Sequence, residues 1–423
     1  MRSLAALLTG LAVVVLGSVE TSAQQAGVAD PKGLAGRVRA LETQLDAAQK
    51  AISQLQGQVA TLQGAASFAL SLKPYVHVDP KPINGLAGPH VIFEGANVHI
   101  RSGSGATDDN GKLTGLGNLI VGYNEISDLP RLPNGAPSVT ADRVGSHNLV
   151  VGPKNEYTSY GGFIAGTYNA VSSKSSSVSA GHFNTATGDY SSVSGGEGNG
   201  ASGNSSSVSG GGENGASGDF SWVGSGQHNG AGPRDAASGL YTSVSGGADN
   251  GAGGGDGASV SGGLGNIASF PDASVSGGLS NTANGEGASV SGGQGNFASF
   301  GFASVCGGLF NVASGEEASV SGGVDNTASG TFASVSGGRW NTATGNAASV
   351  SGGAFNAASG ESSSVSGGGH TTFGGNTAAG LGSSVSGGHA NTAVGNFSSV
   401  SGGQNRSAPS DDSWDAGGLF QSN

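Results

Sequence analysis

The chain has 423 residues, of which 83 are Gly and only 10% are charged, so its composition is that of a repeat protein and not of an ordinary globular domain. The formal net charge is -12 at pH 7, and Lys and Arg are too few to neutralise a phosphate backbone, which excludes a nucleic acid partner. A single cysteine, Cys306, excludes an intrachain disulfide.

Residues 1–23 predict a signal peptide. An apolar run from Leu4 to Leu16 follows Arg2, and the small residues that end at Ala23 offer a cleavage site before Gln24. The run is shorter than the roughly 20 residues that a membrane-spanning helix needs. We therefore expect an exported protein, extracellular, at the cell surface or associated with the outer membrane, with no membrane span in the mature chain.

Residues 24–72 predict a short α-helical coiled coil. Apolar residues recur there at alternating spacings of four and three, the pattern of a helix that buries a narrow seam against other helices. The polar residues beside the seam favour self-association over packing on a domain, with two or three chains. The seam residues are Leu34, Val38, Leu41, Leu45, Ala48, Ile52, Leu55, Val59 and Leu62.

Residues 73–114 predict a connector with the first β-strands. Prolines at 74, 80 and 82 end the helix, and the apolar stretches Val91–Phe93 and Val98–Ile100 are typical of strands. The four residues between them, 94–97, separate the two predicted strands.

Residues 115–162 predict irregular coils of a β-solenoid, where a coil is one turn of the chain around the long axis. The segments Asn118–Gly122 and Asn148–Gly152 are similar and lie 30 residues apart, which is twice the spacing found further on. Between them, Leu129–Pro137 is rich in proline and predicts a loop.

Residues 163–405 repeat with a spacing of 15 residues, interrupted by three insertions, and residues 406–423 are interpreted as a C-terminal tail. One unit reads Ala-Ser-Val-Ser-Gly-Gly-x-x-Asn-x-Ala-Ser-Gly-x-x. Alternation places Val inside and Ser outside a short strand, and the glycines permit sharp turns. Because one such coil cannot bury a core alone, stacked coils are expected. The predicted fold class is all-β, a parallel β-solenoid (β-roll) of about 15-residue repeats.

An Asn column runs through these repeats, six residues after the Val column. We expect it to hydrogen-bond from coil to coil, as amide ladders do in stacked β-structures. Thr371 stands at the expected Asn position beside an insertion, which indicates that the ladder lapses there. Members of the predicted structural ladder include Asn184, Asn266, Asn281, Asn296, Asn311, Asn326, Asn341 and Asn356.

Aromatic residues share the position just before the Asn column and predict a discontinuous ridge. Two interpretations stay open, because exposed apolar ridges mark contact surfaces of either kind: a site for a glycan, matrix or surface ligand, or packing between the chains of an oligomer. The ridge residues are Tyr168, Phe183, Phe310, Trp340 and Phe355.

The sequence carries no pattern of catalytic, cofactor-binding or metal-ligating residues. Nucleophile, zinc and phosphate-loop motifs do not occur. A row of acidic residues follows the turn glycines, but residues such as Asn204 and Gly301 interrupt it, which favours solvated turn charges over calcium ligands. No enzyme activity is therefore predicted. The acidic row contains Asp189, Asp219, Glu286, Glu316 and Glu361.

The repeat resembles the head repeats of trimeric autotransporter adhesins of the YadA type, whose units read Ser-Val-Ala-Ile-Gly-x-x-Ala-x-Ala-x-Gly. The resemblance covers about residues 115–405 and is strongest at Asn118–Gly122, Asn148–Gly152 and Phe163–Gly166. It implies a left-handed β-roll, a homotrimer and surface adhesion. Here Gly replaces most of the family's inner Ile, and Asn its first Ala. Family members end in a membrane anchor of alternating strands, which the last residues do not resemble, so we expect no such anchor.

These patterns predict an exported surface fibre that acts in cell adhesion. The alternative is a purely structural component of an envelope or extracellular matrix, without a ligand. The third class, a carbohydrate-active enzyme on a β-helix, would need clustered Asp, Lys or Arg on one coil, and Lys and Arg nearly vanish after Lys174. Ligand binding would favour the first class, and ordered lateral assembly without a ligand the second.

Overall fold

The computed structural model describes residues 31–126, 143–231, 239–370, 372 and 374–416. The predicted signal peptide, the loop Leu129–Pro137, Thr371 and residues 417–423 lie outside these ranges. The chain divides into two units between His99 and Ile100, so the predicted connector 73–114 contributes to both.

The first unit contains one long helix, α2 (Pro31–Leu72). The helix begins at Pro31, whose missing N–H is not needed in the first turn. It ends shortly before Pro74, because a proline disfavours the helical backbone conformation of the residue that precedes it. The large apolar side chains of the heptad seam, from Leu34 to Leu62, are all 43% to 68% exposed. The described part of this chain therefore leaves the seam uncovered.

Two strands follow the helix. β1 (Val76–Asp79) and β2 (His90–Phe93) pair antiparallel, with Val76 opposite Phe93 and Asp79 opposite His90. The strand predicted at Val98–Ile100 does not form. That prediction was wrong because an alternating apolar pattern makes a strand only where a partner supplies the ladder hydrogen bonds.

A polar cluster around the 3-10 turn η1 (Asp109–Gly111) precedes the coils of the second unit. The carboxylate of Asp109, which is 4% exposed, accepts hydrogen bonds from Ser102 Oγ at 2.5 Å and from Thr114 Oγ1 at 2.7 Å and N at 2.8 Å. Hydrogen bonds from Ser102 first, then Ser104 and Ser146, hold the pKa of Asp109 far below its usual range. The hydroxyl of Ser146 also accepts from the N–H of Thr114 at 3.2 Å, which ties this cluster to a later coil.

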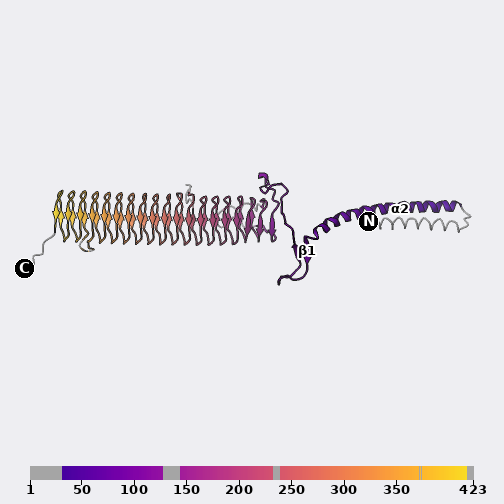
Figure 1. Ribbon diagram of the computed structural model, residues 1–423, viewed down its shortest axis with the longest axis horizontal. Coiled ribbons are helices and arrows are strands. Elements are labelled where there is room, and N and C mark those ends of the chain that lie inside the picture. Colours follow the sequence, from indigo (N-terminus) through magenta and orange to yellow (C-terminus); the bar gives the residue numbers. More distant parts are fainter. Residues whose placement is uncertain (1–30, 127–142, 232–238, 371, 373, 417–423) are drawn as a thin grey trace, which may run out of the picture. The chain divides into compact units, whose positions relative to one another are not determined.

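The second unit is a parallel β-solenoid, whose coils stack one on the next (Figure 1). Two parallel ladders run along the stack. In the first, Ser192 pairs with Ser207 and Val193 with Val208, and the same register continues to the C-terminal strands. Its strands are β3 (Leu119–Val121), β4 (Leu149–Val151), β6 (Phe163–Ala165), β8 (Ser177–Val178), β10 (Ser192–Val193), β12 (Ser207–Val208), β14 (Trp222–Val223), β16 (Ser243–Val244), β18 (Ser259–Val260), β20 (Ser274–Val275), β22 (Ser289–Val290), β24 (Ser304–Val305), β26 (Ser319–Val320), β28 (Ser334–Val335), β30 (Ser349–Val350), β32 (Ser364–Val365), β34 (Ser384–Val385), β36 (Ser399–Val400) and β38 (Trp414–Asp415).

The second ladder is built from the other strand of each coil. Ala201 pairs with Ala216, and a further row of single bridges, such as His182 with Glu197, runs between the ladders along the chain. The strands are β5 (Glu156–Tyr157), β7 (Ala170–Val171), β9 (Thr185–Ala186), β11 (Gly200–Ala201), β13 (Gly215–Ala216), β15 (Gly230–Ala231), β17 (Gly251–Ala252), β19 (Ile267–Ala268), β21 (Thr282–Ala283), β23 (Phe297–Ala298), β25 (Val312–Ala313), β27 (Thr327–Ala328), β29 (Thr342–Ala343), β31 (Ala357–Ala358), β33 (Thr377–Ala378), β35 (Thr392–Ala393) and β37 (Ser407–Ala408).

Small residues fill the core of the solenoid. The inward Val of one ladder and the inward Ala of the other, such as Val275 and Ala283, are at most 2% exposed and belong to one continuous apolar cluster. The turns between them depend on glycine. Gly278 has φ +95°, and a Cβ at this position would lie 2.2 Å from the carbonyl oxygen of Gly293 in the next coil.

The insertions leave the ladder register intact. Trp222 pairs with Ser243 across the first insertion, and Ser364 pairs with Ser384 across the last. The predicted tail 406–423 begins too early, because β37 and β38 continue both ladders. Sequence reasoning missed these strands because Arg406 and Asp415 stand where the repeat has Asn and Val, which hides the pattern.

Candidate functional site

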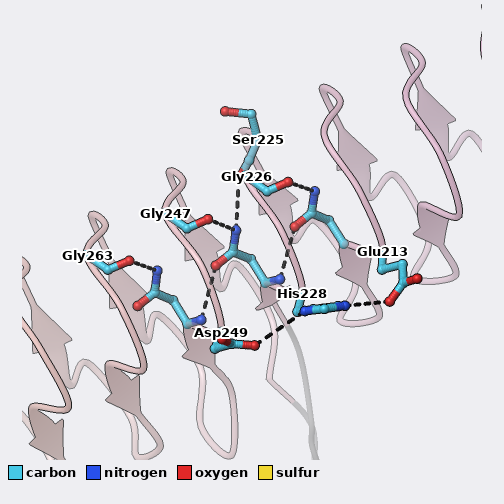
Figure 2. Close-up of polar contacts among 10 residues, drawn as sticks. Glu213, Ser225, Gly226, His228, Gly247, Asp249 and Gly263 are labelled. Atoms are coloured by element: carbon cyan, nitrogen blue, oxygen red, sulfur yellow. Dashed lines mark hydrogen bonds and ion pairs between the residues drawn. The ribbon is translucent and has the colours of Figure 1, made fainter.

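The Asn column is buried and fully hydrogen-bonded. The backbone N–H of Asn296 donates to Oδ1 of Asn281 at 3.0 Å, and Nδ2 of Asn281 donates to the carbonyls of Gly277 at 2.8 Å and Gly293 at 3.0 Å. Figure 2 includes such bonds to the carbonyls of Gly226, Gly247 and Gly263. Each coil is thus tied to the next through a backbone N–H and a side-chain oxygen, which leaves the amide no free hydrogen-bonding group for a ligand.

The Asn column does not lapse beside the last insertion. Asn376 takes the next place after Asn356, with its N–H 2.9 Å from Oδ1 of Asn356. The prediction based on Thr371 was therefore wrong, because the inserted residues precede the ladder position and shift it along the sequence. At the other end, Asn155 and Asn169 extend the column, with Asn169 N–H donating to Asn155 Oδ1 at 3.1 Å.

The predicted aromatic ridge lies on a column of left-handed backbone. Residues with a Cβ rarely adopt this conformation, which is sterically costly. It occurs here because each position lies in a sharp turn of the coil. All five ridge residues have φ between +54° and +61°: Tyr168, Phe183, Phe310, Trp340 and Phe355.

Within the ridge, the aromatic rings contact one another in only two pairs. The rings of Tyr168 and Phe183 have centroids 5.0 Å apart, and those of Trp340 and Phe355 are 4.5 Å apart. The guanidinium of Arg339 lies 3.8 Å from the Trp340 ring centroid, in cation–π geometry. Phe310 is separate, since Gly295 and Asp325 occupy its column in the adjacent coils.

A second aromatic row lies on another left-handed column, in the other turn of the coil. Phe220 and Tyr241 stack there, with centroids 5.1 Å apart and planes at 12°. Sequence reasoning missed this row because it considered only the position before the Asn. The signal was present, since each of these residues lies three positions before a Val of the first ladder. The row contains Tyr190, Phe220, Tyr241, Phe302, Phe332 and Phe397, which are 51% to 63% exposed.

A groove of about 370 Å³ lies beside Phe183 and is lined also by Glu197, Glu213 and glycines that include Gly200 and Gly215. The groove is hollow because its floor lacks side chains. The outward position of the second ladder is glycine in four successive strands, β11, β13, β15 and β17, between Thr185 and Ile267. A second hollow of about 200 Å³ lies at the other end of this glycine floor, beside Ile267.

Acidic residues and histidines lie in two adjacent columns along this region, with His182 and Glu197 in one and Glu213, His228 and Asp249 in the other. Nε2 of His228 is 2.5 Å from Oε2 of Glu213, and its Nδ1 is 3.5 Å from Oδ1 of Asp249 (Figure 2). Nδ1 of His182 lies 3.8 Å from Oε1 of Glu197. These side chains are well exposed, so the groove offers carboxylate acceptors next to the apolar face of Phe183.

Some carboxylates of the acidic row accept hydrogen bonds from backbone N–H groups and are not only solvated charges. Oδ1 of Asp189 accepts from the N–H of Lys174 at 3.2 Å, and Oδ1 of Asp219 accepts from the N–H of Asn204 at 2.7 Å. Each bond links an acidic side chain to the preceding coil. Cys306 is a free, exposed thiol.

Neither a metal site nor a membrane-spanning helix is found within the described residues. In that part of the chain, no group of three or more His, Cys, Asp or Glu side chains could hold a metal ion. Within the described ranges, no helix, α2 included, is long and apolar enough to cross a membrane. No protein-family model and no curated protein matches the chain.

Proposed function

We propose that this protein is an exported, homotrimeric surface fibre that acts in cell adhesion, as its resemblance to trimeric autotransporter adhesin heads implies. The supporting observation is the groove beside Phe183, set on a stack of coils that the Asn column holds in register. Pairing of residues 15 apart in most strands supports a 15-residue structural unit. An adhesive surface of this kind needs no catalytic group.

The proposed coiled coil rests on the uncovered seam of α2. Its large apolar side chains are 43% to 68% exposed over eight heptad positions, and burying them against other helices of the same kind removes this surface from water. Three copies are proposed because the resemblance implies a trimer.

The groove favours a neutral glycan as the ligand. Carboxylates such as Glu197 and Glu213 accept hydrogen bonds from sugar hydroxyls, and Phe183 presents an apolar face on which a sugar ring can stack. The glycine floor lets a flat ligand approach the backbone closely. Acidic glycans are disfavoured, since the same carboxylates would repel them.

The test compares retention of the full chain on immobilised neutral and acidic oligosaccharides. Phe183→Ala is expected to weaken retention on a neutral oligosaccharide about tenfold, the effect of about 1.4 kcal/mol. Phe310→Ala is the matched control, because Phe310 has the same backbone conformation but lies outside the groove. Equal retention of both variants, or no retention of the parent protein, contradicts a glycan site at this groove.

The second candidate is a structural component without a ligand. The exposed second aromatic row, together with Phe310 and Phe355 of the ridge, favours it, since such apolar rows can also pack one solenoid against another. Ordered lateral assembly of the purified protein, with no retention on any oligosaccharide, is the outcome that selects this candidate.

A further inference from the structure

The last described coil departs from the repeat in both halves. Asp415 of β38 stands opposite Val400, at the inward position that Val holds in the preceding strands of this ladder. Arg406 stands at the next place of the Asn column, where its backbone N–H donates to Oδ1 of Asn391 at 2.9 Å. The column therefore ends at Arg406, which has no Oδ1 to offer to another coil.

The two residues that depart from the repeat form an ion pair. Nη1 of Arg406 lies 3.8 Å from Oδ1 of Asp415, and the two side chains are 39% and 27% exposed. The core of this coil is closed, since Val400 is 0% and Ala408 2% exposed. The first coil lacks such closure, because its core residue Ile120, which pairs with Val150, is 38% exposed.

A parallel ladder that ends in an open strand edge is a template for another chain, because its backbone N–H and C=O groups are unpaired on one side. Here the edge strand carries a charge at the core position. Another molecule that stacked on this coil would have to remove Arg406 and Asp415 from water without offering them a new partner, which is strongly unfavourable. Val and Asn at the same two positions would instead present the surface that every preceding coil offers to its neighbour.

We propose that Arg406 and Asp415 form a terminal cap that prevents end-to-end association of the solenoid with a second copy of this chain. The cap acts through the charge at the end of the core column and through the interruption of the Asn column. Solenoids in general need terminal units with a polar outer face, and this pair supplies one.

The test restores the repeat in the full chain with the double substitution Arg406→Asn and Asp415→Val. The mass in solution, measured by light scattering, is expected to rise with protein concentration to at least twice that of the parent protein. Electron microscopy is expected to show solenoids joined at one end, about twice the parent length, which separates end-to-end association from lateral packing and from association through α2.

The matched control keeps both charges and leaves residue 406 without an Oδ1, with Arg406→Lys and Asp415→Glu. It keeps an ion pair at the end of the core and is expected to retain the parent mass and length. Circular dichroism checks that both variants keep the β-structure. The proposal is overturned if the restored variant keeps the parent mass and length at every concentration, or if the charge-retaining variant associates as strongly as the restored one. Neither outcome depends on whether the groove binds a glycan.

Discussion

At the scale of single residues, the Asn column and Asp109 are buried polar groups whose hydrogen-bonding groups find partners. Burying an amide or a carboxylate is costly unless each of its hydrogen-bonding groups finds a partner. Asn281 meets this condition with three bonds, and Asp109 with hydroxyl and backbone donors around its carboxylate. Loss of one such side chain therefore removes several hydrogen bonds at once.

Asn296→Ala is expected to loosen two coils at once. It leaves the N–H of Asn311 and the carbonyls of Gly292 and Gly308 without their side-chain partner, at a cost of about 3 kcal/mol or more. Hydrogen exchange followed by mass spectrometry should show faster exchange in peptides that span residues 292–311. Ser291→Ala, at an exposed position of the same coil, should leave exchange unchanged, and equal exchange in both variants contradicts a structural role of the column.

Asp109 is expected to make stability depend on acid pH. Its pKa in the folded protein lies far below the value of about 3.9 that an unfolded chain has, so folding favours the ionised form. The contribution is complete above that unfolded value and is lost as the pH falls toward the folded pKa. The melting temperature of Asp109→Asn should therefore differ most from the parent near neutral pH, and the difference should shrink below about pH 4. Thr107→Ala, at an exposed neighbour that does not titrate, is the control.

At the scale of elements, α2 differs from the strands because nothing described in the chain covers its apolar seam. A helix of 42 residues with a strip of exposed Leu, Val and Ile is unusual in a protein that remains a monomer. The strands are the opposite case. Each strand of the solenoid is only two or three residues long and gains its stability from the neighbouring strands of its ladder.

Lysine in the seam of α2 is expected to reduce the oligomer to single chains. We expect residues 24–423, without the proposed signal peptide, to have three times the mass of one chain by light scattering. Deletion of residues 24–72, or the pair Leu45→Lys and Ile52→Lys, should reduce it to the mass of one, because charges in the seam must leave water on association. Ser53→Lys and Gln54→Lys, on the opposite side of the helix, are the control. A single-chain mass for the parent protein contradicts the trimer.

At the scale of the whole molecule, the solenoid was predictable from the sequence, because a fixed spacing of Val and Asn can only be satisfied by coils in register. The same reasoning failed where a residue's role depends on neighbours that the sequence does not place. Val98–Ile100 has the pattern of a strand but no partner, and Asn376 keeps the ladder although inserted residues shift its position.

The candidate site was predictable only in part, for a similar reason. Phe183 could be predicted from its place before the Asn column. The groove beside it, however, arises where glycines such as Gly200 and Gly215 have no side chain to fill the space. The second aromatic row follows the same period as the first and escaped notice because it lies in the other turn of the coil. The pairing of Arg406 with Asp415 needed the ladder register to be recognised.

The Asn column has a consequence for how the length of such a protein can change. Each Asn bonds only to the coil before and the coil after, and every unit offers its neighbours nearly the same surface. Loss of one unit, such as residues 318–332, would bring Ser304 opposite Ser334 and Asn311 opposite Asn341, with no new kind of contact to build. Unequal recombination between the repeated stretches of the gene can therefore lengthen or shorten the solenoid in steps of about 4.8 Å, while both ends stay as they are.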